Sequence, residues 1–215
     1  MATIEEISED KFNNIRIIVS RWYDRRHFVS MLKVVYKDHL ENSILSNDKT
    51  TIDILNSLYA AGHLSSTDPT LLYETIKLTN QLGLEKKIKA VLPSLPNIRE
   101  IAISRFSDHR QRIVKFGHAL IDDHIQAIDG IHNNPKEKYS DGWCMISDLE
   151  YKLKICKGKR MDKFIKKLKT LELDNLIRIL KDITPNRKRK HKKTIEDVQV
   201  QPRGKKKKSR TPNKK

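Results

Sequence analysis

Two histidines and an acidic residue on one predicted helix are the first candidates for chemistry. His118, Asp122 and His124 lie close together in the chain. His118 and Asp122 are about one helical turn apart, so they share a helix face, whereas His124 falls off that face. A metal site needs at least three convergent ligands. We therefore interpret His118 and Asp122 as a solvated or hydrogen-bonded surface pair, with a metal or catalytic role as the alternative.

The two cysteines, Cys144 and Cys156, are too few to build a disulfide framework. No neighbouring pattern indicates a lowered thiol pKa, so we expect reduced, partly buried thiols. The sequence also has no Gly-rich phosphate loop, no Gly-x-Ser-x-Gly and no Cys-x-x-Cys. It therefore predicts a protein that is not an enzyme, with no cofactor and no metal.

Positive charge is concentrated at the C-terminal end of the chain. The 215 residues carry 44 Lys or Arg and 27 Asp or Glu, a formal charge of +17. The stretch 186–215 holds 14 of the basic residues and 2 of the acids. Because 184–215 lacks apolar periodicity, it predicts a disordered basic tail.

Two dense basic clusters in the tail suit the acidic groove of an import receptor or the phosphates of DNA or RNA. A solubilising role is the plain alternative. We predict nuclear localisation, with shuttling to the cytoplasm left open. The candidate import or nucleic-acid residues are Arg187, Lys188, Arg189, Lys190, Lys192, Lys193, Arg203, Lys205, Lys206, Lys207 and Lys208.

No apolar run approaches the roughly 18–20 residues that span a bilayer, so no membrane partner is expected. The acidic start of the chain also lacks the pattern of a signal peptide.

Residues 8–93 predict a series of short helices and no strand, so the fold class is all-α. Apolar residues recur every three or four positions, as at Phe12, Ile15 and Val19. Asp24 is expected to cap the second helix. Asp68 and Pro69 form a helix start signal, an acidic cap followed by proline.

The order of these elements resembles a death effector domain over about 40% of the chain. The resemblance is carried by 28–35, 52–58, 58–65, 71–72 and 82–85, which include Leu-Tyr-Ala-Ala-Gly-His-Leu-Ser and Leu-Gly-Leu-Glu. It implies a six-helix antiparallel death-fold bundle over 8–93. It also implies association with death effector domain proteins such as adaptors or caspase prodomains, and regulation of the apoptotic process. Some family members also show nuclear and DNA-binding behaviour, and this layout is similar.

The sequence departs from the family at its charged motif, Arg-x-Asp-Leu. Gly83, Glu85 and Lys86 occupy the Arg, Asp and Leu positions, and Arg25 and Arg26 stand where the family has an acid. These changes make the region basic, so we expect residues 1–96 to form no homotypic filaments near physiological salt and to prefer an acidic partner. The candidate partner-binding residues by analogy are Arg25, Arg26, Phe28, Lys33, Thr75, Leu78, Gly83, Leu84, Glu85 and Lys86.

Residues 97–183 predict a second helical region. The stretch from Ile98 to Ile131 has helical periodicity, with Ser107 as a cap that divides it, and further helices are expected from Trp143 to Leu153 and from Met161 to Leu180. A weak echo of the spacing around Ile76 recurs around Ile165. The region is therefore either a generic helical extension or a degenerate second death-fold module.

The sequence thus supports two functional hypotheses. The first is a non-enzymatic adaptor or regulator of apoptotic signalling. The second is a sequence-nonspecific nucleic acid or chromatin binder that uses the basic tail.

Overall fold

The computed structural model describes residues 7–181 and is all-helical there, as the sequence predicts. Its helices are α1 (Glu9–Asp24), α2 (Val29–Val35), the 3₁₀ helix η1 (Tyr36–Asp38), α3 (Asn42–Asn47), α4 (Thr51–Ala60), α5 (Thr70–Leu78), α6 (Leu84–Lys89), α7 (Asp108–Ala119), α8 (Asp122–His132), α9 (Gly142–Tyr151), α10 (Lys159–Thr170) and α11 (Asp174–Lys181).

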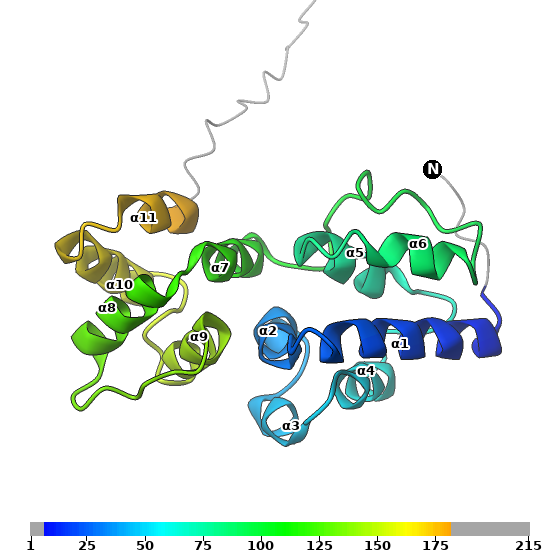
Figure 1. Cartoon of the computed structure of the whole chain (residues 1–215), viewed down its shortest axis with the longest axis horizontal. Helices are drawn as coiled ribbons and strands as arrows, with labels where there is room; N and C mark the ends of the chain where they lie inside the picture. The colour runs from blue at the N-terminus through cyan, green and yellow to red at the C-terminus, as the bar shows by residue number, and fades with distance from the viewer. Residues whose placement is uncertain (1–6, 182–215) are drawn as a thin grey trace, which may run out of the picture. The chain divides into compact units, whose positions relative to one another are not determined.

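Six α-helices lie between Glu9 and Lys89, the number that the resemblance implies. Helix α1 packs along α4 and also contacts α6 (Figure 1). Whether this is the death-fold arrangement stays a prediction. The predicted tail, 184–215, and its basic clusters lie outside the described residues.

Local capping explains several helix starts. Thr50 and Asp53 form a reciprocal capping box at α4, and the side chain of Ser107 accepts a hydrogen bond from the Arg110 N–H at the start of α7. The cap at Ser107 is confirmed, but no helix precedes it within 98–106, and the stretch that follows is divided at Leu120 and Ile121, between α7 and α8. Asp24 does not cap α2, because it is the last residue of α1, and its carboxylate accepts from the Thr51 N–H of α4 at 3.0 Å.

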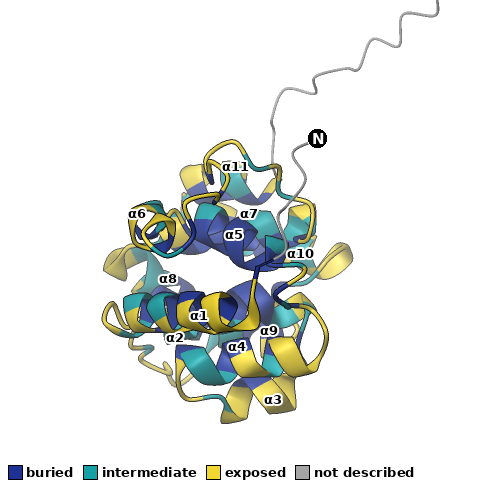
Figure 2. Ribbon diagram, turned by 90° about the vertical axis from the view of Figure 1, so that its right-hand side faces the viewer, coloured by how far each residue is buried: buried dark blue, intermediate teal, exposed yellow. Residues whose placement is uncertain are grey.

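Buried side chains form two hydrophobic clusters. One joins α1–α6 with Phe106 and Val114, and the other joins α7–α11 with Val34 of α2. Figure 2 shows the dark blue buried faces of α1 and α5 and the largely exposed α3. Helix α2 therefore takes part in both clusters. The division into modules at 8–93 and 97–183 stays a prediction.

The segment 98–106 was expected to be helical, and that prediction is wrong. Its backbone bonds to side chains of α5 instead of to itself. The fully buried Glu74 carboxylate accepts from the Ser104 N–H at 3.0 Å and the Arg105 N–H at 2.8 Å. Lys77 Nζ donates to the Arg99 carbonyl at 2.8 Å. These bonds satisfy backbone groups that a helix would pair internally.

The helix predicted through Leu153 also ends earlier. Helix α9 stops at Tyr151, and Leu153 follows with a φ of 55° and about half of its surface exposed. Ile155, not Leu153, fills the core after this turn.

A buried arginine joins α7 to the elements around it. The Arg110 guanidinium, 2% exposed, donates to the Val34 carbonyl at 2.7 Å, to Glu150 Oε2 at 3.0 Å and to Asp38 Oδ1 at 2.7 Å. A buried charge is tolerated only when it is paired and hydrogen-bonded, as it is here. The network links α2 and η1 to α7 and α9.

Candidate functional site

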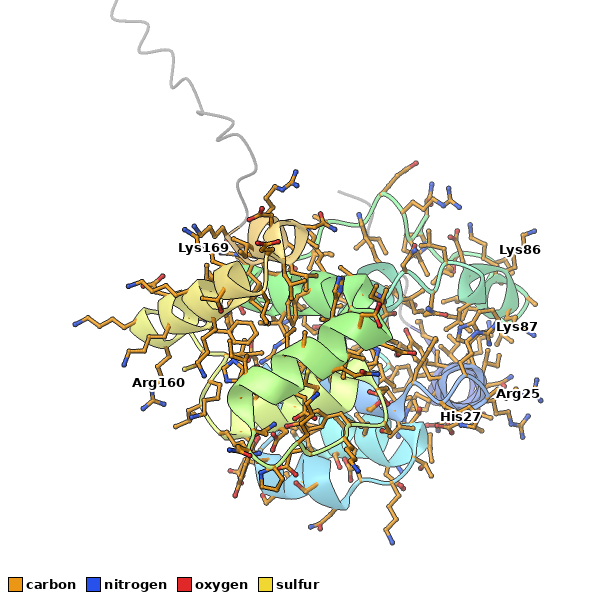
Figure 3. The ribbon with its side chains drawn as sticks, turned by 60° about the vertical axis from the view of Figure 1, so that its left-hand side comes forward. Arg25, His27, Lys86, Lys87, Arg160 and Lys169 are labelled. Atoms are coloured by element: carbon orange, nitrogen blue, oxygen red, sulfur yellow. The ribbon has the colours of Figure 1, made fainter. Side chains whose placement is uncertain are left out.

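A basic surface forms where the end of α1 meets α6. We call it the Trp22 surface, and it comprises Trp22, Arg25, Arg26, Lys86 and Lys87. Its four cationic side chains are exposed, and Trp22 is half-buried. Figure 3 shows Arg25, Lys86 and Lys87 together at one edge of the molecule, with His27 beside them.

Trp22 is fixed at the centre of this surface by three contacts. Its Nε1–H donates to Gln81 Oε1 at 3.0 Å, and the Arg26 guanidinium carbon lies 3.6 Å from the ring centroid. Such a cation–π contact contributes about 0.5–1 kcal/mol at an exposed site. Gly83 borders the ring, and a Cβ there would lie 3.0 Å from Trp22 Cη2. The glycine at this position therefore leaves room for the indole.

Acidic side chains near the Trp22 surface are already engaged. Glu85 pairs with Lys89 at 2.6 Å, and Asp24 accepts from Thr51 and from Ser20. Within 7–181, no ion pair involves Arg25, Arg26, Lys86 or Lys87. Their charge is left for solvent or for a partner.

The structure brings together half of the predicted partner-binding residues. Arg26 and Gly83 both lie against the Trp22 ring. Arg25 precedes Arg26, and Glu85 and Lys86 belong to α6, which contacts α1. The altered motif is thus one continuous region.

Three predicted contact residues are corrected, because they lie inside the protein. Thr75 is 1% exposed, and its hydroxyl bonds to that of Tyr36 at 2.8 Å. Leu78 is also buried, and Leu84 is 0% exposed. All three side chains belong to the helix faces that pack inward, so they cannot touch a partner directly.

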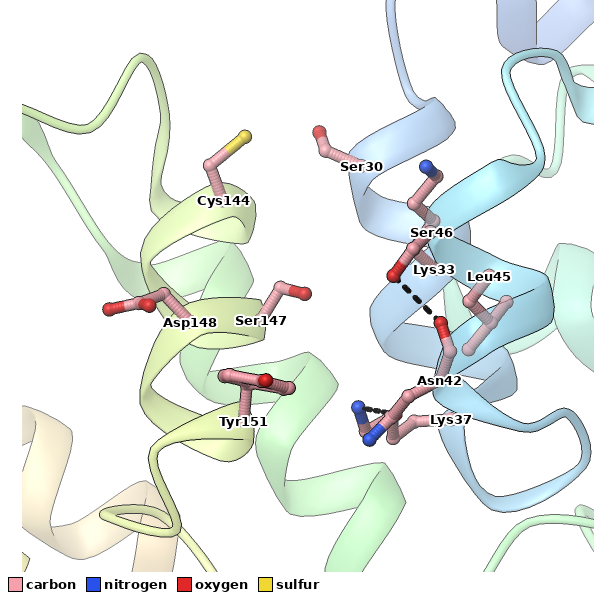
Figure 4. Close-up of a pocket in the computed structure, with 10 residues that line it drawn as sticks. All are labelled: Ser30, Lys33, Lys37, Asn42, Leu45, Ser46, Cys144, Ser147, Asp148 and Tyr151. Carbon is pink, nitrogen blue, oxygen red and sulfur yellow. Dashed lines mark hydrogen bonds between the residues drawn. The ribbon is translucent and has the colours of Figure 1, made fainter.

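Phe28 and Lys33 are engaged elsewhere in the fold. Phe28 is half-buried, with its ring edge-on to Tyr23 at 6.4 Å between centroids. Lys33 lines a groove of about 430 Å³ between α2–α3 and α9 (Figure 4). This groove also contains Cys144 and Asp148, but the residues that line it include no histidine to act as a base.

The residues considered for chemistry show ordinary structural contacts. Burial raises the pKa of Cys144, so it stays a thiol near neutral pH. The His118 ring lies edge-on to Trp143 at 5.2 Å, and burial lowers its pKa. Residues 7–181 contain no cluster of three or more His, Cys, Asp or Glu arranged for a metal. No helix in the same part of the chain is long and apolar enough to cross a membrane.

Sequence reasoning missed Trp22 as the centre of the site. A signal was available, since Trp22 and Arg26 are four residues apart, a spacing at which side chains are neighbours in a helix. The contact with Gly83, in contrast, joins distant parts of the chain.

Comparison with models of known protein families, with curated proteins and with solved structures found no match.

Proposed function

We propose that the chain is a non-enzymatic interaction protein, an adaptor or regulator of apoptotic signalling, whose Trp22 surface binds an acidic face of a partner. The observation that carries this proposal is the set of exposed cations around a fixed indole, which have no carboxylate partner among residues 7–181. Tryptophan and arginine are the residue types that most often dominate binding energy at protein interfaces.

The partner class comes from the resemblance to death effector domains. Adaptors and caspase prodomains are the proposed partners, through contacts between death folds. The count of six α-helices between Glu9 and Lys89 supports that reading. The replacement of the family's charged motif by Gly83, Glu85 and Lys86 favours a partner with a complementary, acidic face.

Reversing two charges of the Trp22 surface tests this function. We expect Arg25→Glu/Lys86→Glu to weaken binding to an acidic-faced death effector domain by about tenfold, mainly through slower association. The difference should shrink as ionic strength rises, because exposed charges are screened. Surface plasmon resonance of the full chain against purified adaptor and prodomain domains measures both effects.

A matched control variant changes the net charge by the same amount at another surface. Lys11→Glu/Lys49→Glu alters two exposed lysines outside the Trp22 surface and should leave affinity within a small factor. Equal losses in both variants would contradict the assigned surface. Light scattering should detect no filaments of the full chain at micromolar concentration near physiological salt, since like charges oppose self-association.

The second candidate function uses the tail, whose 14 Lys or Arg against 2 acids are the observation in its favour. We infer that these clusters engage an import receptor, or the phosphates of DNA or RNA without sequence preference. The protein would then be nuclear.

Glutamine substitutions in the tail test this candidate. Replacing every Lys and Arg of 187–193 and 205–208 with Gln should leave the protein cytoplasmic or diffuse in fluorescence microscopy. Binding to DNA should be lost and, in the unchanged chain, should fall steeply with salt. An unchanged circular dichroism spectrum is the control for folding. Sequence-selective, salt-insensitive DNA binding by the variant would instead place that activity on the helices.

A further inference from the structure

A second basic site lies far along the chain from the Trp22 surface. An open cavity of about 400 Å³ is lined by residues of α10, the end of α8 and the segment at the end of α9. This volume lies within the range of small-molecule sites. In the described chain, the residues that line it include Lys154, Arg160, Lys163 and Lys167 but no carboxylate. We call these four residues the cavity cations.

Three of the cavity cations form one stripe of α10. Arg160, Lys163 and Lys167 follow one another at intervals of three and four residues, so they are neighbours on the same helix face. Like charges at this spacing destabilise a helix by about 0.2–0.5 kcal/mol per pair. The repulsion among these three side chains destabilises α10. An anion bound in the cavity would offset that repulsion.

Within the described residues, the carboxylates near the cavity pair with Lys152, which is not one of the cavity cations. Lys152, which also lines the cavity, pairs with Glu137 at 2.9 Å and with Asp148 at 2.8 Å. None of the ion pairs within 7–181 involves a cavity cation. The ammonium of Lys167 donates instead to the neutral carbonyl of Ile131 at 3.1 Å.

The positive charges of the cavity cations act on His132. Its ring lines the cavity and packs against Phe164, with 5.3 Å between centroids. Burial, and then the positive charges of Lys167 and Lys154, lower the pKa of His132 to about 4. The imidazole is therefore neutral near pH 7 and adds no charge of its own.

We propose that this cavity binds a compact ligand that carries several phosphate groups. Phosphate oxygens are strong acceptors, and hydrogen bonds from ammonium or guanidinium groups to them are about twice as strong as neutral ones. A nucleic acid backbone is tracked by charges spread along a groove, whereas here the four cavity cations and the paired Lys152 line a single small cavity. The inference rests on α10 and its neighbours and is independent of the function proposed for the Trp22 surface.

The test uses inorganic tripolyphosphate and the full chain, with variants that leave the basic tail intact. Arg160→Gln/Lys163→Gln removes two cavity cations. Lys166→Gln/Lys169→Gln removes two exposed lysines of the same helix that do not line the cavity. Figure 3 shows Arg160 and Lys169 pointing away from each other on α10. Because both variants lose two charges, binding by the tail is affected equally.

We expect one tripolyphosphate per chain at the cavity in isothermal titration calorimetry, at least about tenfold weaker in Arg160→Gln/Lys163→Gln and unchanged in Lys166→Gln/Lys169→Gln. Binding should also raise the pKa of His132, followed by the pH dependence of its imidazole NMR signals, because the ligand neutralises the cations around it. Equal weakening in both variants, or a His132 pKa that does not move, would overturn the proposal. The proposal would also be overturned if the chain had no tripolyphosphate site and Arg160→Gln/Lys163→Gln selectively lost binding to a short DNA duplex.

Discussion

Arg110→Met is expected to lower the free energy of unfolding by about 3–5 kcal/mol, because it removes one partner of a buried ion pair. Glu150, only 8% exposed, would lose the guanidinium that it bonds at 3.0 Å. The Val34 carbonyl would also lose its donor. Urea denaturation monitored by circular dichroism measures the loss.

The loss from Arg110→Met should depend on pH in a defined direction. Burial already raises the pKa of Glu150 despite Arg110, and removal of the arginine would raise it further. When the pKa of a carboxyl is higher in the folded than in the unfolded state, the free energy of unfolding of the protein falls as pH rises. The deficit of the variant should therefore be larger near pH 8 than near pH 5.

A matched control is Arg105→Met, which breaks the exposed pair between Arg105 and Asp68. Exposed pairs contribute about 0–1 kcal/mol, so this variant should stay close to the parent. The double variant Arg110→Met/Glu150→Leu should recover part of the loss, since no buried charge is left without a partner. Comparable losses from Arg105→Met and Arg110→Met would show that the buried network does not stabilise the fold.

Gly117→Ala is the second change with a large expected effect, a destabilisation of about 1–3 kcal/mol. Alanine normally stabilises a helix by about 1 kcal/mol relative to glycine. In α7, however, an added Cβ would lie 2.8 Å from Trp143 Cε3 and still closer to two other carbons of that ring. The rigid indole contacts both hydrophobic clusters, so it has little freedom to move.

Gly130→Ala provides the comparison, because Gly130 is also inside a helix. Its added Cβ would meet Lys136 Cε at 3.0 Å, near the end of a flexible side chain that can shift. We expect Gly130→Ala to be neutral or to raise stability by up to about 1 kcal/mol. In thermal unfolding, Gly117→Ala combined with Trp143→Phe should show favourable coupling. Equal effects of the two alanine variants would contradict the proposed clash.

Local patterns were sufficient to predict most helices. Periodicity placed α1 and the apolar face of α10, and the cap at Ser107 marked the start of α7. The failure at 98–106 has a different cause. Ile98 and Ile101 are three residues apart, as on one face of a helix, but Glu74 and Lys77 bond the backbone of this segment through contacts that no local window contains.

The candidate site was predictable only in part. The charges of Arg25, Arg26 and Lys86 could be taken directly from the sequence, and the contact between α1 and α6 brings them together. Leu84 was placed at a contact surface by analogy, but it belongs to the face of α6 that packs inward. The role of Trp22 depends on Gln81 and Gly83, more than fifty residues away, so it required the tertiary structure.

The sharing of α2 between two clusters determines how fragments of this protein will behave. A polypeptide that ends near Leu95 would retain Val34 but lose Ile113 and Phe116, which belong to the same cluster as Val34. In this fragment the apolar side of α2 that includes Val34 would be exposed to solvent. Aggregation of such a fragment would then result from the truncation and not from homotypic assembly of the native protein. Self-association should therefore be measured on the full chain.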